Sequence, residues 1–208
     1  MIENLIFDFD GTISDSYPIF LKLVRLVAKD YGVAVDRTDE QLLDKLLINV
    51  KTCLEPMEFP CPIEERMAAF WKYQRLFYKE FKPFPEIEAI LQKSLDLGKK
   101  NYIYTHSGDV VFDILKNMGL DGYFSGVVTA DKGFPSKPAP DALFYLCEQY
   151  GLSPENCLMI GDRDIDTMSG NNAGTKGCLW DFYGRYPDYH TDYKIQTLSE
   201  LFDLLDTI

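Results

Sequence analysis

The stretch that decides the fold is Asn4-Leu5-Ile6-Phe7-Asp8-Phe9-Asp10-Gly11-Thr12, close to the start of the chain. Its apolar run predicts a buried strand with Asp8 and Asp10 at the carboxyl end. Two carboxylates two residues apart point the same way and repel each other, so a cation held between them is favoured. Gly11 allows a turn that brings backbone N–H groups near an anion. Taken alone, the pattern also fits a solvated acidic turn.

Short apolar runs alternate with helical patterns along most of the remaining chain. Further strands are predicted at Asn101–Thr105, Gly126–Ala130, Cys157–Gly161 and Lys176–Trp180. Helices are predicted at Glu86–Leu97, Val110–Met118, Asp141–Tyr150, Ile165–Asn172 and Ser199–Leu205, the last capped by Ser199. This alternation indicates an α/β fold, a Rossmann-like parallel sheet covered by helices on both faces.

One long segment after the first strand breaks the alternation, because it shows helical patterns and no strand. Thr38 and Gln41 form a capping-box pair, and a long amphipathic helix is predicted to continue to Phe81. We therefore expect an all-helical insert within the α/β core. The core comprises residues 1–15 and 83–208, and the insert comprises residues 16–82.

Three further polar motifs follow predicted strands. The Thr105 hydroxyl can donate to a phosphate oxygen, although this position also suits a helix cap. Lys137 lies between prolines and can neutralise a carboxylate and a phosphoryl group, the alternative being an ordinary loop lysine. Asp162 would complete an oxygen site for a hard cation, with Asp166 one turn later, unless both merely complement a helix dipole. Because parallel strand ends meet at one edge of the sheet, where ligands bind, all four motifs should converge there.

These motifs resemble those of the haloacid dehalogenase superfamily over nearly the whole chain. The helical insert is similar to the α-helical cap of its phosphoglycolate phosphatase and β-phosphoglucomutase branch. The resemblance implies Asp8 as nucleophile, an aspartyl-phosphate intermediate, Asp10 as acid and base, and a cap that selects the leaving group. It implies that Mg²⁺ is held by Asp8, Asp162 and the backbone carbonyl of Asp10, with Asp166 beyond these direct ligands. The residues expected to bind the substrate phosphate are Phe9, Asp10, Gly11, Thr105, His106 and Lys137.

Two positions depart from the family pattern. His106 stands where the family often has Asn; its backbone N–H can still bind phosphate, and the role of its imidazole is left open. The segment Ile48–Thr52 lacks the glycine of the specificity loop in related caps, so the substrate is also left open.

Asp10 favours a phosphatase of a small phosphorylated metabolite over a dehalogenase. A phosphomutase of the β-phosphoglucomutase type is the alternative, and its sugar contacts would come from Lys45, Asn49, Lys51, Arg66 and Arg75, each of which could instead be a solvated cap residue. A catalytically silent phosphate-responsive binding or signalling protein is a third possibility. It is disfavoured because no acid or lysine of the motifs has been lost.

The charge and composition of the chain disfavour several classes of binding partner. The net charge is −12 with only 21 Lys and Arg, which disfavours nucleic acid because its binding requires many cations. No segment approaches the about 20 apolar residues that span a bilayer, and the start of the chain lacks a secretory pattern, so we expect a cytoplasmic protein with no membrane contact. The five cysteines have no paired spacing, which disfavours a disulfide framework or a zinc site. The oligomeric state is left open.

Overall fold

The computed structural model describes all residues, Met1–Ile208. It consists of two compact units, one formed by Met1–Ser14 with Pro83–Ile208 and the other by Asp15–Lys82. The boundary drawn from the sequence lies one residue later, after Asp15. No helix in either unit is both long enough and apolar enough to cross a membrane.

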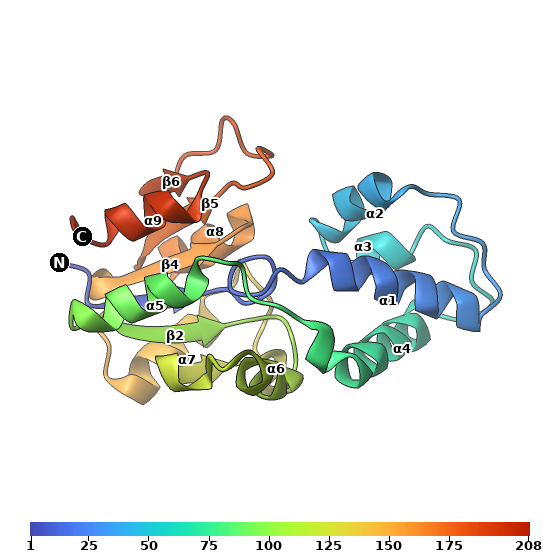
Figure 1. The fold of residues 1–208 in the computed structure, drawn as a ribbon, viewed down its shortest axis with the longest axis horizontal. Helices are drawn as coiled ribbons and strands as arrows, with labels where there is room; N and C mark the ends of the chain where they lie inside the picture. Colours follow the sequence, from blue (N-terminus) through green and yellow to red (C-terminus); the bar gives the residue numbers. More distant parts are fainter. The chain divides into compact units, whose positions relative to one another are not determined.

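The larger unit contains a six-stranded parallel sheet in the order β3-β2-β1-β4-β5-β6 (Figure 1). The strands are β1 Asn4–Phe7, β2 Lys100–Tyr104, β3 Phe124–Val128, β4 Cys157–Gly161, β5 Lys176–Trp180 and β6 Tyr193–Ile195. Every residue of the central strands β1 and β4 is buried, which means that both faces of the sheet are covered. The predicted α/β class is therefore confirmed.

Helices cover both faces of the sheet, because successive side chains of each strand point to opposite faces. They are α5 Ile87–Asp96, α6 Val110–Met118, α7 Asp141–Tyr150, α8 Asp164–Asn172 and α9 Leu198–Leu204. Ile6 of β1 lies in a buried cluster with Leu143 and Leu146 of α7. Since neighbouring residues of a strand face opposite sides, Leu5 and Phe7 point to the other face. Helices α5 and α9 lie side by side (Figure 1).

Apart from one-residue shifts at the ends of other elements, three details of this unit differ from the sequence prediction. Strand β3 begins at Phe124, two residues earlier than expected, and ends at Val128. Strand β6 was missed because three residues with Lys194 at their centre are too short for an apolar pattern. Helix α9 is capped by Thr197, not Ser199, because the extended Thr197 accepts the backbone N–H of Glu200 at 3.3 Å.

The smaller unit is entirely helical. It contains α1 Tyr17–Asp30, α2 Asp39–Leu46, α3 Val50–Leu54, α4 Ile63–Leu76 and the short 3₁₀ turn Tyr78–Glu80. The capping box of Thr38 and Gln41 is confirmed, with bonds of 3.3 and 3.0 Å. Helix α4 ends at Leu76 instead of continuing to Phe81, whose ring packs 6.0 Å from that of Phe20 in the interior of this unit.

The segment expected to be a cap loop forms part of a helix. Helix α3 begins at Val50, and the Asn49 side chain caps it by accepting the Thr52 N–H at 2.7 Å. Arg66 donates to the carbonyls of Leu54 at 3.1 Å and Cys61 at 2.8 Å, which ties this segment to helix α4. Two of the candidate sugar contacts, Asn49 and Arg66, thus support the local fold.

Candidate active site

Three acids meet at the carboxyl edge of the sheet. Asp8 directly follows β1, Asp162 directly follows β4, and these two strands are neighbours. Asp166 lies in the first turn of α8, which follows Asp162 closely. One carboxylate oxygen from each of the three lies within 4.8 Å of the others, and all three residues are buried. The sequence-predicted convergence of these acids is therefore present in the structure.

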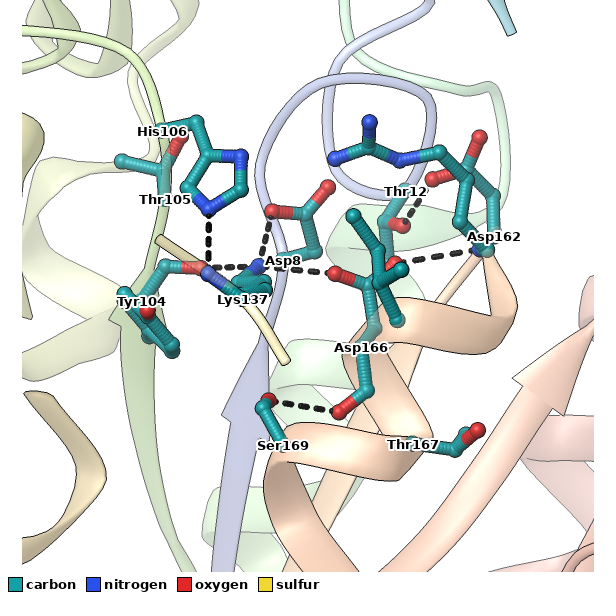
Figure 2. Close-up of polar contacts among 12 residues, drawn as sticks. Asp8, Thr12, Tyr104, Thr105, His106, Lys137, Asp162, Asp166, Thr167 and Ser169 are labelled. Atoms are coloured by element: carbon teal, nitrogen blue, oxygen red, sulfur yellow. Dashed lines mark hydrogen bonds and ion pairs between the residues drawn. The ribbon is translucent and has the colours of Figure 1, made fainter. Parts of the chain in front are cut away.

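Lys137 provides a buried positive charge between two of these acids (Figure 2). Its Nζ lies 2.6 Å from Asp8 Oδ1, 2.8 Å from Asp166 Oδ1 and 2.9 Å from the carbonyl oxygen of Tyr104. Burial by itself lowers the pKa of Lys137, but the charges and hydrogen bonds of Asp166 and Asp8 raise it above its ordinary value. The lysine is therefore protonated, and all three of its donors are used.

The two carboxylates that share Lys137 differ in their surroundings. Burial raises the pKa of Asp8 against the opposing charge of Lys137 and, together with the negative charge of Asp166, brings it to about 7. Burial also disfavours ionised Asp166, but Lys137 and Arg163 outweigh it and lower the pKa of Asp166. One reason is that Asp166 Oδ2 accepts the backbone N–H of Arg163 at 3.0 Å, whereas Asp8 Oδ2 is buried without a hydrogen-bond partner.

This donor set fits a hard divalent cation. A buried carboxylate oxygen without a partner is unfavourable, and Asp8 Oδ2 is such an atom. One carboxylate oxygen of Asp162 lies within 4.8 Å of a carboxylate oxygen of Asp8. Oxygen ligands of this kind suit Mg²⁺, and a bound cation would lower the raised pKa of Asp8. Both oxygens of Asp166 already accept hydrogen bonds, which suits a place beyond the direct ligands.

The turn after β1 holds Asp10. Ser107 Oγ donates to Asp10 Oδ2 at 2.5 Å, and Ser107 is almost completely buried. Ser107 is not predicted from the sequence, although its place two residues after Thr105 is an available signal. Gly11 has φ +83°, which explains the glycine, but its N–H donates to Ser14 O at 2.8 Å. The Gly11 N–H is thus used within the turn, and phosphate binding by Gly11 stays a prediction.

The end of β2 contributes Thr105 and His106. The buried Thr105 hydroxyl accepts the N–H of Ser107 at 3.0 Å and keeps its own proton for donation. His106 Nε2 accepts the backbone N–H of Lys137 at 2.9 Å (Figure 2). Burial, together with the charges of Lys137 and Arg163, lowers the pKa of His106 to about 3, so the ring is neutral. The imidazole, whose role the sequence leaves open, thus contacts the Lys137 backbone.

The fold and this group of residues define an α/β protein with buried acids and a lysine at the carboxyl edge of its sheet. The haloacid dehalogenase-like hydrolase family matches residues 5–179. Because that match covers most of the chain, the protein belongs to this family. The resemblance stated from the four motifs, and the expectation of an enzyme, are thereby confirmed.

Individual relatives cover nearly the whole chain. A phosphoglycolate phosphatase from Aquifex aeolicus is 29% identical over 97% of this chain and 96% of its own length. The pyrophosphatase PpaX from Bacillus cereus is 30% identical over 98% of this chain and 96% of its own length. A haloacid dehalogenase-like hydrolase from Bacteroides fragilis has a TM-score of 0.84 at 21% identity, covering 97% of this chain and 100% of the other. CbbY from Rhodobacter sphaeroides, solved with phosphate, has a TM-score of 0.80 at 18% identity, covering 97% and 96%. The two structures show a shared fold.

Proposed function

We propose that this hydrolase is a magnesium-dependent phosphatase of a small phosphorylated metabolite, with Asp8 as the nucleophile. The observation that carries the proposal is the arrangement around Asp8. One of its oxygens is held by the buried Lys137, the other lacks a partner, and Asp162 lies close by. The names of the relatives, phosphoglycolate phosphatase and pyrophosphatase, support phosphate ester or anhydride substrates.

The metal ligands that we propose are Asp8, Asp162 and the backbone carbonyl of Asp10. Asp166 stays outside this set and holds Lys137. When bound, Mg²⁺ supplies positive charge that makes the approach of two anions, the Asp8 carboxylate and the phosphate ester, electrostatically possible.

In the proposed reaction Asp8 attacks phosphorus in line, forming an acyl phosphate as the bond to the leaving oxygen breaks. Asp10 donates a proton to that oxygen. It then takes a proton from a water molecule that attacks the same phosphorus, which releases inorganic phosphate and restores Asp8. Lys137, Thr105 and the N–H groups of Phe9, Asp10 and His106 hold the phosphoryl oxygens during both steps.

The test is a screen of small phosphate esters with Mg²⁺, repeated with a chelator. The wild type should release inorganic phosphate, and the chelator should abolish release. An Asp8→Asn variant should remain folded and lose turnover by roughly 10⁴-fold or more, because the amide is not a nucleophile. Turnover near that of the wild type in this variant would contradict the mechanism. Conversion of a hexose 1-phosphate to the 6-phosphate without phosphate release would instead identify a phosphomutase.

A further inference from the structure

We infer that His106 is a positioning residue whose imidazole holds the backbone of Lys137 against the end of strand β2, so that the ammonium group stays between Asp8 and Asp166. The inference rests on the proposed function, because Lys137 matters for turnover only if it neutralises the reacting groups. His106 itself touches none of the acids in this role and acts through the lysine.

The end of β2 holds Lys137 at two points. His106, two residues after Tyr104, accepts the Lys137 backbone N–H at its Nε2 atom, with a separation of 2.9 Å. The Tyr104 carbonyl accepts the Lys137 ammonium, also at 2.9 Å. Backbone and side chain of one lysine are thus bound to the same strand end (Figure 2). Together these contacts fix the direction in which the lysine side chain runs toward Asp8.

The loop that carries Lys137 is attached to α8 where the Pro138 carbonyl accepts Asn172 Nδ2 at 2.9 Å, but few of its backbone N–H groups can attach it to other elements. Pro135, Pro138 and Pro140 cannot donate hydrogen bonds. The Ala139 N–H is used within the loop, where it donates to Ser136 O at 3.0 Å. The Lys137 N–H, by contrast, reaches another element of the fold.

A small cavity borders one side of this loop. This cavity of about 60 Å³ lies between the end of β2 and the loop, and its lining includes His106, Phe134, Pro135 and Ser136. The Phe134 ring lies 5.1 Å from the ring of Tyr145, so the loop is held by this packing as well as by the hydrogen bond to His106.

The contact requires a particular form of the ring. An imidazole that accepts at Nε2 is neutral and carries its proton on Nδ1. Alanine at this position would leave the Lys137 N–H without its acceptor. Glutamine has a carbonyl oxygen at similar reach and would restore an acceptor. His106→Ala therefore removes the acceptor together with the ring, and His106→Gln restores an acceptor.

The kinetic test compares these variants with wild type on 4-nitrophenyl phosphate in saturating Mg²⁺. We expect His106→Ala to lower kcat about 10- to 100-fold, with a much smaller change in KM, since displaced supporting residues typically cost this much. His106→Gln should recover most of the loss. The exposed His190 provides the matched control, and His190→Gln should leave kcat unchanged. Equal kcat for His106→Ala and wild type, or equal losses for the Ala and Gln variants, would overturn the inference.

Nuclear magnetic resonance tests the contact without any turnover. The chain has only two histidines, so ¹⁵N-labelled histidine gives a simple spectrum, and His190→Gln leaves the His106 signals alone. At neutral pH we expect a protonated Nδ1 and an unprotonated Nε2 for His106. A protonated Nε2 would overturn the inference even if the Ala variant fails to fold. If wild type hydrolyses no ester, the proposed function fails while this spectrum still decides whether the contact exists.

Discussion

At the scale of single residues, the site depends on side chains that fix the direction of charged groups. Ser107 does this for Asp10, the proposed acid and base, by donating one short hydrogen bond to its carboxylate. The donor is buried, and its bond to Oδ2 fixes the direction of the Asp10 carboxylate. If Ser107 supports the acid function of Asp10, its loss should matter most for substrates whose leaving group needs a proton.

Ser107→Ala should lower kcat/KM for an alkyl phosphate by about 10-fold more than for 4-nitrophenyl phosphate. An alkoxide leaves poorly without a proton from Asp10, whereas nitrophenolate leaves well without one. The parameter kcat/KM reports the steps up to departure of the leaving group. Ser107→Thr keeps the hydroxyl and serves as the control. If both substrates lose the same factor in the Ala variant, Ser107 does not act through the acid function of Asp10.

The neutral His106 should make the stability of the chain depend on pH. Burial, Lys137 and Arg163 lower the pKa of His106 to about 3, against a smaller opposing effect of Asp166. The unfolded imidazole takes up its proton near pH 6.5, at the ordinary value. Between these values the unfolded chain binds one proton more, so the free energy of unfolding falls as pH falls.

Urea unfolding of the wild type and His106→Gln at several pH values checks this expectation. Relative to the variant, the wild type should lose stability from about pH 6.5 downward, with a slope of at most about 1.4 kcal/mol per pH unit because one proton is involved. Other titrating groups are common to both proteins and cancel in the difference. Parallel pH profiles for the two proteins would show that His106 is not held neutral.

At the scale of elements, the junction between β4 and α8 places Asp162 and Asp166. Gly161 ends the strand, and a Cβ atom there would lie 2.3 Å from Cβ and 2.4 Å from Oδ2 of Asp166. Such distances are far below contact, so helix α8 would have to move away from the sheet. Absence of a side chain at Gly161 thus permits the close approach that brings Asp166 to Lys137.

Gly161→Ala should lower the free energy of unfolding by about 1–3 kcal/mol, as overpacked substitutions do, and should also reduce turnover. Chemical denaturation and phosphate release measure the two effects. Gly122→Ala is the control, because a Cβ at Gly122 meets nothing within 4 Å. A Gly161→Ala protein as stable and active as the control would contradict the close packing of α8 on β4.

At the scale of the whole molecule, an acidic protein with a net charge of −12 places three carboxylates in its interior. Their mutual repulsion is only partly offset by Lys137, which contacts two of them. A cation that binds the folded chain alone stabilises it by mass action, by about 2.7 kcal/mol at a concentration 100 times its Kd.

MgCl₂ should therefore raise the melting temperature of the wild type above that in NaCl of equal ionic strength, which controls for screening. Asp162→Asn removes one proposed ligand charge and should lose most of this difference. Differential scanning calorimetry of the four combinations is the measurement. A shift of the same size in both proteins would place the cation elsewhere on the molecule.

The sequence by itself determined the class of fold and the main charged groups of the site. Apolar runs alternating with helical patterns specify a parallel sheet, because period and burial are local properties of a strand or helix. Asp8, Asp162 and Thr105 stand at strand ends in the sequence, and parallel strands bring their ends to one edge whatever the details of packing. Lys137 is assigned to the site through the family motifs. It lies in a loop, so no strand register predicts its position.

Only the tertiary structure decided which atoms of these segments touch. Ser107 reaches Asp10 across 97 positions, and His106 reaches the Lys137 backbone across 31. Such contacts depend on where two loops lie after the sheet has assembled, and no local pattern encodes that. The same holds for the Gly11 N–H, which the turn uses. Strand β6 is set likewise by its partner, because three residues with a central lysine form a strand only when β5 supplies the neighbouring hydrogen bonds.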